Sequence, residues 1–378
     1  MEEFLITPWE VRGKIDYEKL MKDFGIKPIS KTILRRLSKY GKIHTFLRRG
    51  IVFGHRDFDW ILRKFEKGEK FYLYTGRGPS GKTHLGHLIP WIFTKYLQDT
   101  FKAKLYFQVT DDEKFLLGKV KMDEVRSYVY DNLLDFYALG FNQKLTKILI
   151  DTVDIPELYK IAVKVAKSIN FSVVRAVFGF ENTTNIGMIF FPAIQAAPCF
   201  IETEISGKAT PCLIPASPDQ DPYWRGIARA VAEKLGYYKP AQIYTKILPG
   251  LKEGEKMSSS KPSTCIFTTD SAEDVKRKVA DIFTGGQPTI REQREKGGNP
   301  KICRVFQYLL FFEDSDKDIK KVRRECESGK LTCGECKKML AQKLIKFLER
   351  HKENREKAKV VVDEIFREKG LQLSLIHI

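Results

Sequence analysis

Cysteine is scarce in this chain, and so are long apolar stretches. Seven cysteines are scattered over 378 residues, an odd number that does not suit the disulfide framework of a secreted protein. Apolar runs such as Met188–Phe191 and Tyr308–Phe312 are far shorter than the roughly 20 residues of a membrane-spanning helix. The opening residues, MEEFLITPWE, do not resemble a secretion signal. We therefore expect reduced thiols, a cytoplasmic location and no association with a membrane.

A metal site is not expected either. Cys333 and Cys336 form a C-x-x-C pair, a spacing found in zinc sites, and Cys326 lies near them in the sequence. A complete site needs a fourth ligand, but no further Cys or His stands at a convincing spacing. The sequence alone therefore predicts no protein-bound metal.

Acidic residues are outnumbered by basic ones. The chain has 66 Lys and Arg against 48 Asp and Glu, a net charge of +18. The excess lies at the two ends: residues 1–70 carry 17 basic against 10 acidic side chains, and residues 271–378 carry 25 against 18. Positive flanks suit a long polyanion better than a small ligand, so we expect a nucleic-acid partner.

The stretch Phe71–Gln98 predicts a phosphate-binding turn. An apolar strand, Phe71–Tyr74, is followed by a turn with several glycines, and from His84 onward apolar residues recur at helical spacing. Unpaired backbone N–H groups converge where a helix begins, and the helix dipole favours an anion there. The sequence therefore indicates a nucleotide site at this turn.

Two nucleotide signatures overlap in the turn. Gly76–Thr83 fits the P-loop pattern G-x-x-x-x-G-K-[ST] of ATPases and kinases, and His84–His87 fits the pattern H-x-G-H. Pro79 has no N–H group to offer a phosphate, which weakens the P-loop interpretation. In a third interpretation the turn is an ordinary one, and its histidines only cap the helix or pack.

A further motif lies 256 − 84 = 172 residues after His84. The pentapeptide KMSSS, Lys256–Ser260, stands within Gly250–Ser263, a polar segment with Gly and Pro that predicts a mobile loop. The P-loop interpretation does not account for this motif, whereas H-x-G-H and a KMSKS-like loop occur together in one enzyme class.

With both signatures present, the chain resembles the class I aminoacyl-tRNA synthetases, and among them the tryptophanyl-tRNA synthetases of the eukaryotic and archaeal type. Further matching segments are Phe46–Gly50, Gln108–Lys114, Phe191–Pro198 and Asp219–Tyr223. The similarity runs from about residue 4 to about residue 370. Trp224 departs from the pattern, because Phe is more usual there, and the turn before His84 is one residue shorter than in that branch.

The resemblance implies an α/β fold with a Rossmann-like doubly wound parallel-sheet catalytic domain, a helical insertion and a C-terminal α-helical bundle domain. It divides the chain into a basic N-terminal extension packed on the catalytic core (1–70), the catalytic domain (71–263, with the insertion at about 115–205) and a helical anticodon-binding domain (264–378). Because the insertion carries the dimer contact in this family, a homodimer is expected.

The resemblance also implies a role for individual residues. Those implied in catalysis belong to the two signatures: His84, Gly86, His87, Lys256, Met257, Ser258, Ser259 and Ser260. Those implied in ATP binding are Thr75, Gly76, Arg77, Gly86, His87, Lys256 and Ser258. Those implied in tryptophan binding are Tyr74, Gln108, Glu113, Lys114, Gln195 and Gln220. The expected partners are ATP, L-tryptophan and tRNA(Trp), with Mg²⁺ held by the ATP phosphates rather than by the protein.

The implied chemistry is attack of the tryptophan carboxylate on the α-phosphorus of ATP, followed by transfer of the aminoacyl group to a tRNA hydroxyl. Because two anions must meet, the protein has to position them and stabilise the growing charge. We expect His84 and His87 to act between their neutral and charged forms, and Lys256 to bring a cation to the leaving pyrophosphate.

Three alternatives remain open. The first is the tyrosyl enzyme of the same class, although Thr110–Lys114 and Phe191–Pro198 favour tryptophan. The second is a P-loop ATPase or small-molecule kinase that uses Gly76–Thr83. The third is a non-enzymatic RNA-binding protein built on the same fold.

Overall fold

The computed structural model describes residues 15–118 and 120–372, and the backbone of residues 5–6 and 11–12. In this part of the chain a seven-stranded sheet forms the centre of the molecule. Its order across the sheet is β3 (Lys27–Pro28), β4 (Val52–Arg56), β9 (Ala241–Thr245), β8 (Cys212–Ala216), β5 (Tyr72–Arg77), β6 (Lys104–Val109) and β7 (Thr146–Ile150). A separate two-stranded sheet pairs β1 (Leu5–Ile6) with β2 (Val11–Arg12).

The five strands from β9 to β7 run parallel, and their order is that of a doubly wound fold. Numbered along the chain from β5 and read across the sheet from β7 to β9, they stand as third, second, first, fourth and fifth. The direction of winding therefore reverses between β5 and β8. In open α/β sheets, ligands bind at the carboxyl ends of the strands at such a switch point. The predicted fold class is confirmed.

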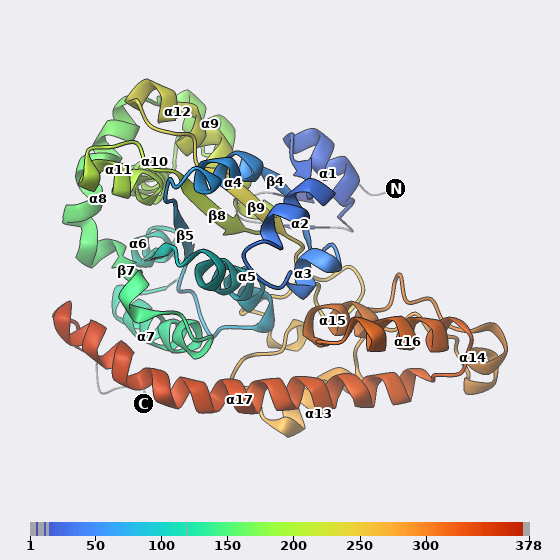
Figure 1. Ribbon diagram of the computed structural model, residues 1–378. Coiled ribbons are helices and arrows are strands. Elements are labelled where there is room, and N and C mark those ends of the chain that lie inside the picture. Colours follow the sequence, from blue (N-terminus) through green and yellow to red (C-terminus); the bar gives the residue numbers. More distant parts are fainter. Residues whose placement is uncertain (1–4, 7–10, 13–14, 119, 373–378) are drawn as a thin grey trace.

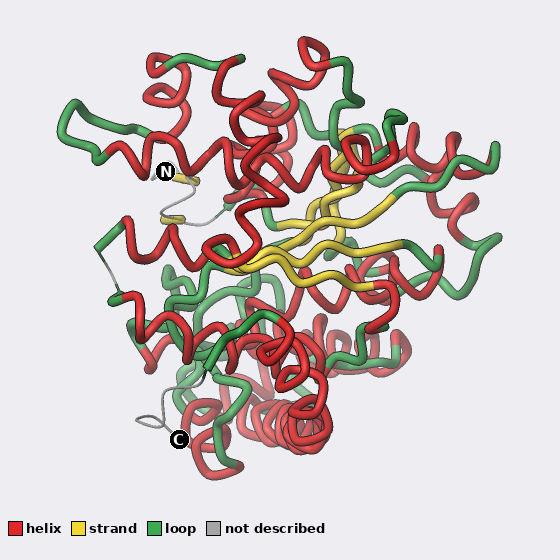
Figure 2. The backbone as a smooth tube through the Cα atoms, turned by 90° about the vertical axis from the view of Figure 1, so that its left-hand side faces the viewer, coloured by secondary structure: helices red, strands yellow, loops and turns green. Residues whose placement is uncertain are grey.

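Helices lie on both sides of the sheet (Figure 2). Alternating side chains give each face of the sheet its own core. Leu73, Leu105 and Phe107 join one apolar cluster, whereas Tyr74 and Tyr106 join the other. Helices α5 (Leu85–Phe101) and α7 (Met122–Ala138) pack against the first face, and α8 (Asp151–Lys167) and α10 (Ile186–Ala196) against the second. Burial on both faces explains why these strands are so apolar.

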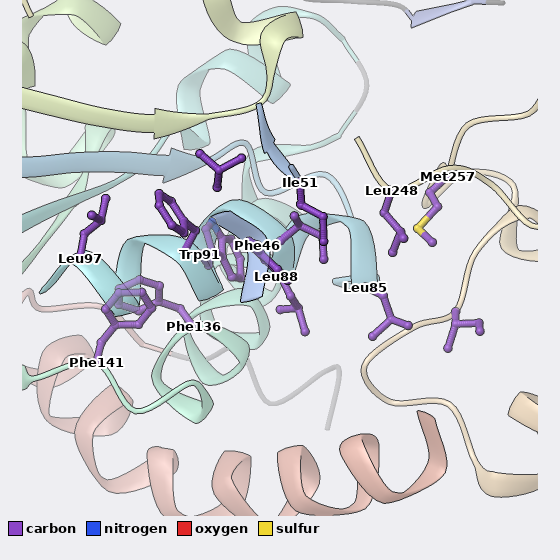
Figure 3. Packing of buried hydrophobic residues seen from close by; sticks show 14 of the residues in the cluster. Phe46, Ile51, Leu85, Leu88, Trp91, Leu97, Phe136, Phe141, Leu248 and Met257 are labelled. Atoms are coloured by element: carbon purple, nitrogen blue, oxygen red, sulfur yellow. The ribbon is translucent and has the colours of Figure 1, made fainter. Parts of the chain in front are cut away.

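Helix α5 lies within the first core along its whole length (Figure 3). Leu85 and Leu88 occupy its first turn, and Trp91 and Leu97 continue the buried face. Trp91 contacts the rings of Phe107 and Phe136 edge-on. The helix that begins at the predicted phosphate-binding turn is therefore held firmly by its apolar side.

The N-terminal residues do more than pack on the core. The helices α1 (Tyr17–Phe24), α2 (Lys31–Leu37), α3 (Thr45–Arg48) and α4 (Phe58–Glu66) surround two strands, β3 and β4. Strand β4 pairs antiparallel with β9 and so extends the central sheet. The sequence pattern indicated only a short β-like piece at Ile51–Phe53. All five residues of Val52–Arg56 are buried, but they include Gly, His and Arg, which do not form the apolar pattern typical of a buried strand.

Between β6 and β8 the chain is mostly helical, as predicted. The helices are α6 (Asp111–Leu116), α7, α8, α9 (Phe171–Phe178), α10 and α11 (Ile201–Ser206). The sequence reasoning missed β7, a short strand that pairs with β6 at the edge of the sheet. The helical run Ile186–Ser206 is long and apolar enough to cross a membrane, but 72% of its apolar window is buried inside the protein, as in a core helix.

After β8 the chain forms a π-helix, Pro222–Ala228, which continues into α12 (Arg229–Ala232). The C-terminal part holds α13 (Ala272–Ala280), α14 (Ile290–Lys296), α15 (Arg304–Phe312), α16 (Asp316–Glu327) and α17 (Cys333–Glu368). Helix α17 has 36 residues, about 54 Å at 1.5 Å per residue. It runs from α14 and α16 at one end of the molecule to α7 beside the sheet (Figure 1).

Buried charges join α17 to α7. The Asp135 carboxylate lies 2.8 Å from His351 Nε2 and 2.6 Å from Arg355 Nη1, and Asp135 is fully buried. Burial alone would raise the pKa of Asp135, but the hydrogen bond from His351 and the charge of Arg355 hold that pKa below its usual value. The interaction is therefore fully formed at neutral pH and is lost only as the pH falls through this lowered pKa.

We predict that Asp135→Ala destabilises the protein by about 3–5 kcal/mol. The substitution removes the carboxylate that buried His351 and Arg355 share, and it leaves Arg355 only its pairing with Asp131. Urea unfolding at neutral pH measures the effect. Asp363→Ala is the matched control: it removes an exposed hydrogen bond with Tyr130 between the same two helices and should cost less than about 1 kcal/mol. Equal effects of the two substitutions would contradict the importance of the buried cluster.

Candidate active site

A cavity of about 260 Å³ opens at the switch point of the sheet. The carboxyl ends of β5, β6 and β8 form its floor, and α5, α6 and the π-helix form its walls. It brings together eleven residues that the sequence implied in binding: Tyr74, Thr75, Gly76, Arg77, Gly86, His87, Gln108, Glu113, Lys114, Gln195 and Gln220. His84 and Lys256–Ser260 do not line the cavity but lie beside it, against the turn that leads into α5.

The turn between β5 and α5 depends on close backbone approaches. A Cβ at Gly76 would lie 2.5 Å from the carbonyl oxygen of Gln108, and one at Gly78 would lie 2.4 Å from Lys114 Cε. A side chain at Gly76 would collide with the backbone of β6, whereas one at Gly78 would displace the flexible end of the Lys114 side chain. Arg77 between them is partly buried, and its Nε donates to Asn132 Oδ1 at 3.1 Å.

His84 and His87 form a pair at the start of α5. Their rings stack with centroids 3.5 Å apart. His87 Nδ1 accepts the backbone N–H of His84 at 3.1 Å, so a neutral His87 must carry its proton on Nε2. His84 Nδ1 is buried and has no hydrogen-bond partner among the described residues. The pair therefore keeps imidazole nitrogens, His84 Nδ1 and His87 Nε2, that can still form hydrogen bonds with a ligand.

Both imidazoles are neutral in the ligand-free protein. Burial, followed by the charges of Arg77 and Lys256, lowers the pKa of His84 to about 3. Burial and the charge of Arg77 likewise hold the pKa of His87 well below its usual value. The lowered pKa values favour the neutral form of both rings in the ligand-free protein, whereas the sequence predicted that they work between their neutral and charged forms. The burial of His84 and the nearness of Arg77 and Lys256 depend on the fold and are not visible in the sequence.

The KMSSS segment contacts the same turn. Leu85 N donates to Ile266 O, and Thr268 N donates to Thr83 O, each at 3.0 Å, so the chain after the loop pairs with the chain before α5. Ser259 Oγ donates to Lys82 O at 3.1 Å. Two segments that are 172 residues apart in sequence, as counted from His84 to Lys256, thus lie against one another.

Met257 anchors the loop from the apolar side. Its side chain is buried, and it lies beside Leu248 near the Leu85 end of α5 (Figure 3). A Cβ at Gly86 would lie 3.1 Å from Met257 Sδ, so the glycine of H-x-G-H leaves room for the methionine of KMSSS. Lys256, next to this anchor, is exposed and free to turn toward a ligand.

Tyr74 and Gln108 meet at the inner end of the cavity. Tyr74 Oη is within hydrogen-bond reach of Gln108 Oε1 and of the Gln195 carbonyl, the latter at 2.9 Å. A hydroxyl has one proton, so it can serve only one of these oxygens at a time. Gln108 Nε2 donates to Asp151 Oδ1 at 2.8 Å, which turns the amide oxygen of Gln108 toward Tyr74 and the cavity.

Charged groups lie at the other end of the cavity. Lys114 Nζ is 2.8 Å from Glu113 Oε2, which also accepts a hydrogen bond from Thr110 Oγ1 at 3.0 Å. Gln220 Nε2 donates to Asp219 Oδ2 at 3.2 Å. The cavity therefore has an aromatic and amide end and a zwitterionic end, which suits an amino acid with a large side chain.

Sequence reasoning missed three residues at this site. Asp151 follows β7 directly, so its position at the carboxyl end of a strand would have indicated it if β7 had been recognised. Asn132 is a fully buried polar residue in the middle of α7. Trp224 lines the cavity, its ring meets that of Tyr74 edge-on at 5.2 Å, and its Nε1 has no hydrogen-bond partner within the described residues.

Comparison with known proteins agrees with this geometry. A family model described as class I tRNA synthetases (W and Y) matches residues 66–349. The chain belongs to this family.

Individual relatives match over nearly the whole chain. The synthetase is 50% identical to the tryptophan–tRNA ligase of Pyrobaculum aerophilum, covering 96% of its own length and 97% of that protein. It is 49% identical to the tryptophan–tRNA ligase of Pyrococcus horikoshii, covering 96% and 94%. Two solved structures are also similar. Tryptophanyl-tRNA synthetase from Plasmodium falciparum has a TM-score of 0.86 at 38% identity, and the match covers 90% of this chain and 94% of that one. Tryptophanyl-tRNA synthetase from the archaeon Aeropyrum pernix has a TM-score of 0.86 at 31% identity, and the match covers 96% of this chain and 97% of that one.

The resemblance drawn from the two signatures is thereby confirmed, and the chain is an aminoacyl-tRNA ligase. The P-loop interpretation fails on geometry as well. Thr83 is completely buried and its carbonyl is tied to Thr268, and neither Thr83 nor Lys82 lines the cavity. A P-loop would turn both side chains toward the phosphates.

We predict that the imidazole signals of His84 and His87 do not titrate between pH 5 and pH 8 in the ligand-free synthetase. An NMR titration of histidine-labelled protein, with His84→Asn and His87→Asn for assignment, measures this. Because the unfolded chain binds these protons near pH 6.5 and the folded chain does not, the pair also lowers stability as the pH falls below about 6.5. A midpoint between pH 6 and 7 for either signal would contradict the prediction.

Proposed function

We propose that this synthetase activates L-tryptophan with ATP to tryptophanyl-adenylate and then transfers the tryptophanyl group to tRNA(Trp). The observation that carries the proposal is the arrangement of the cavity: a hydrogen-bonding aromatic and amide end, a zwitterionic end, and the two signature segments against one another beside it. The relatives that are about half identical over their full length are named tryptophan–tRNA ligases, which favours tryptophan over the tyrosine alternative.

In this proposal ATP lies over the turn between β5 and α5. Thr75, Gly76 and Gly86 leave room for adenosine and phosphate, and Arg77, which stays charged although burial lowers its pKa to about 10, faces the phosphates. Neutral His87 offers Nε2–H as a donor to a phosphate oxygen. A neutral donor can orient the phosphate while the negative charge of the phosphate stays available to Arg77 and Lys256.

Lys256 supplies the mobile charge. It is exposed on the loop that Met257 anchors, so its side chain can swing toward the leaving pyrophosphate while the backbone stays in place. Ser258, Ser259 and Ser260 offer hydroxyl donors on the same loop. Such groups accelerate the reaction to the extent that they stabilise charge that appears only in the transition state. Mg²⁺ is proposed to accompany ATP and to be held by its phosphates.

Tryptophan is proposed to enter with its indole at Tyr74 and Gln108. The indole N–H needs an acceptor, and the amide oxygen of Gln108 is turned toward the cavity because Nε2 is engaged by Asp151. Phenylalanine would leave this acceptor unpaired, a loss of about 1–3 kcal/mol. Glu113 with Gln195 and Gln220 would hold the ammonium group, and Lys114 the carboxylate.

The tRNA and a second subunit are proposed to contact other parts of the chain. The helical region 264–378 is the proposed anticodon-binding domain, and its excess of basic residues suits a polyanion. Exposed apolar side chains support a homodimer formed through the region 115–205, because most of the large ones lie there. They are Phe115, Tyr159, Val163, Phe171, Val173, Ile186 and Ile205. A cytoplasmic location is part of the proposal.

We predict that Gln108→Ala lowers kcat/KM for tryptophan in tryptophan-dependent ATP–pyrophosphate exchange by roughly 10- to 100-fold, the equivalent of one unpaired buried group, while KM for ATP changes little. Gln98→Ala is a matched control, because Gln98 is a buried glutamine whose side chain bonds Thr146 and Asn142 outside the cavity. Unchanged exchange and unchanged selectivity against phenylalanine in Gln108→Ala would remove Gln108 from the pocket.

We also predict that Lys256→Ala slows exchange by roughly 100-fold or more, since it removes a charge aimed at the leaving group. Lys82→Ala, on the same turn but exposed, should change kcat by less than about threefold. The rates of both variants are compared at saturating ATP and tryptophan. If Lys82→Ala abolished turnover and Lys256→Ala did not, the site would work as a P-loop instead.

A further inference from the structure

A buried amide in α7 holds both sides of the turn that follows β5. Asn132 lies in the interior of α7 and is completely buried. Its Oδ1 accepts a hydrogen bond from Arg77 Nε, and its Nδ2 donates to the Gly81 carbonyl, each at 3.1 Å. Arg77 is the last residue of β5, and Gly81 lies at the far side of the turn. One side chain from another element therefore spans the turn.

The chemistry of the two partners fixes the orientation of this amide. Arg77 Nε can only donate a hydrogen bond, and the Gly81 carbonyl can only accept one, so Oδ1 of Asn132 must face Arg77 and Nδ2 must face Gly81. A carboxylate at this position would serve Arg77 but would have no proton for the carbonyl, and an apolar side chain would serve neither partner. The position thus needs a short side chain that carries both a donor and an acceptor.

Packing alone does not explain an asparagine here. Asparagine is a poor residue for a helix interior, and a buried amide costs stability unless it is hydrogen-bonded. The neighbouring positions Leu133, Leu134 and Phe136 are buried and apolar. Both hydrogen bonds that the Asn132 side chain forms with described residues go to the turn after β5, so the role of the amide lies there.

The charge of Arg77 remains available to a ligand. Its Nη2 is buried and has no hydrogen-bond partner among the described residues. The carboxylates that act on its pKa are those of Glu113 and Asp135, and each is bonded to another cation: Glu113 to Lys114 at 2.8 Å and Asp135 to Arg355 at 2.6 Å. A neutral amide therefore orients the guanidinium group without compensating its charge, which suits the binding of a phosphate.

The second hydrogen bond of the amide supports the part of the turn that contacts the KMSSS loop. A Cβ at Gly81 would lie 3.4 Å from Ser259 Cβ, and Ser259 Oγ donates to the carbonyl of the next residue, Lys82, at 3.1 Å. Asn132 thus fixes both the arginine of the turn and the stretch of backbone against which the loop rests.

Helix α7 is itself held in place near Asn132. Asp131 and Asp135, which flank Asn132 in the helix, pair with Arg355 of α17 at 2.5 Å and 2.6 Å. Helix α17 runs beside α7 (Figure 1). The amide is therefore in position before any ligand arrives, as preorganised stabilisation of charge requires.

We propose that Asn132 is a positioning residue for the activation step: its neutral amide holds the Arg77 guanidinium group toward the phosphates of ATP and ties Arg77 to the backbone beneath the KMSSS loop. Asn132 does not line the cavity, so it acts through Arg77 rather than on ATP itself. This inference rests on the proposed function in one respect, that ATP is the ligand of the turn.

The test compares two substitutions of Asn132 in tryptophan-dependent ATP–pyrophosphate exchange with the full-length protein. Asn132→Ala should lower kcat/KM for ATP by roughly 10- to 100-fold, the effect of one lost hydrogen bond to a charged group, while KM for tryptophan changes by less than about threefold. Asn132→Asp keeps the shape and the acceptor for Arg77, yet it should be at least as harmful, because it compensates the charge of Arg77 and faces the Gly81 carbonyl without a proton.

Gln98→Ala is the matched control, since Gln98 is a buried amide that bonds Thr146 and Asn142 outside the cavity. It should leave kcat/KM for ATP within about threefold of the wild-type value, as expected for a site without shared partners. Thermal unfolding and tryptophan binding, followed by fluorescence, show whether each variant is folded. If Asn132→Ala does not fold, the isosteric Asn132→Asp carries the test.

A double-mutant cycle separates positioning of Arg77 from a merely structural role. If Asn132 acts through Arg77, then in an Arg77→Ala background either substitution of Asn132 should change kcat/KM for ATP by less than about threefold. The proposal is overturned if a folded Asn132 variant keeps the wild-type kcat/KM for ATP, or if the loss is equally large with and without Arg77.

The affinity for ATP is measured in the same four proteins by titration calorimetry, with the same loss and the same non-additivity expected. This keeps the inference separate from the proposed function. A wild-type protein that binds ATP but shows no tryptophan-dependent exchange would refute the proposed function, whereas the calorimetric cycle would still support or overturn the role of Asn132.

Discussion

A short antiparallel bridge connects the beginning of α5 with the chain that follows the KMSSS loop. Its two hydrogen bonds, from Leu85 N to Ile266 O and from Thr268 N to Thr83 O, are each 3.0 Å long. This bridge holds the loop against the turn where β5 ends and α5 begins, at the switch point of the sheet. Met257 adds an apolar contact beside Gly86, so the backbone of the loop is anchored while Lys256 remains exposed. The relative position of the two signatures therefore follows from the core and not from a ligand.

The electrostatics of the site follow from this anchoring. Burial, reinforced by the charges of Arg77 and Lys256, lowers the pKa values of both histidines, and Lys114 adds to this effect at His87. A neutral imidazole beside fixed cations can orient a phosphate without repelling magnesium. The same fixed dipoles and charges are the kind of preorganised environment that lowers a barrier for phosphoryl chemistry. Behind the aromatic and amide end of the cavity, the Asp151 carboxyl group fixes the amide of Gln108 by accepting its hydrogen bond.

The parts of this account that sequence could predict are those with strong local patterns. The predicted strand at Phe71–Tyr74 and the helix predicted from His84 onward are found as β5 and α5, with the glycine-containing turn between them. Strand β7 was missed because only its last three residues are buried. The lowered pKa of His84 depends on packing between distant segments, which a local pattern does not contain.

The central claim is that both signature segments close around a single ATP. A crystal structure of the synthetase with tryptophan and a non-hydrolysable ATP analogue measures this most directly. The account predicts that the triphosphate lies within hydrogen-bond distance of His87 Nε2 on one side and of Lys256 Nζ on the other. A triphosphate bound by Lys82 and Thr83, with Lys256 still turned toward solvent, would contradict it.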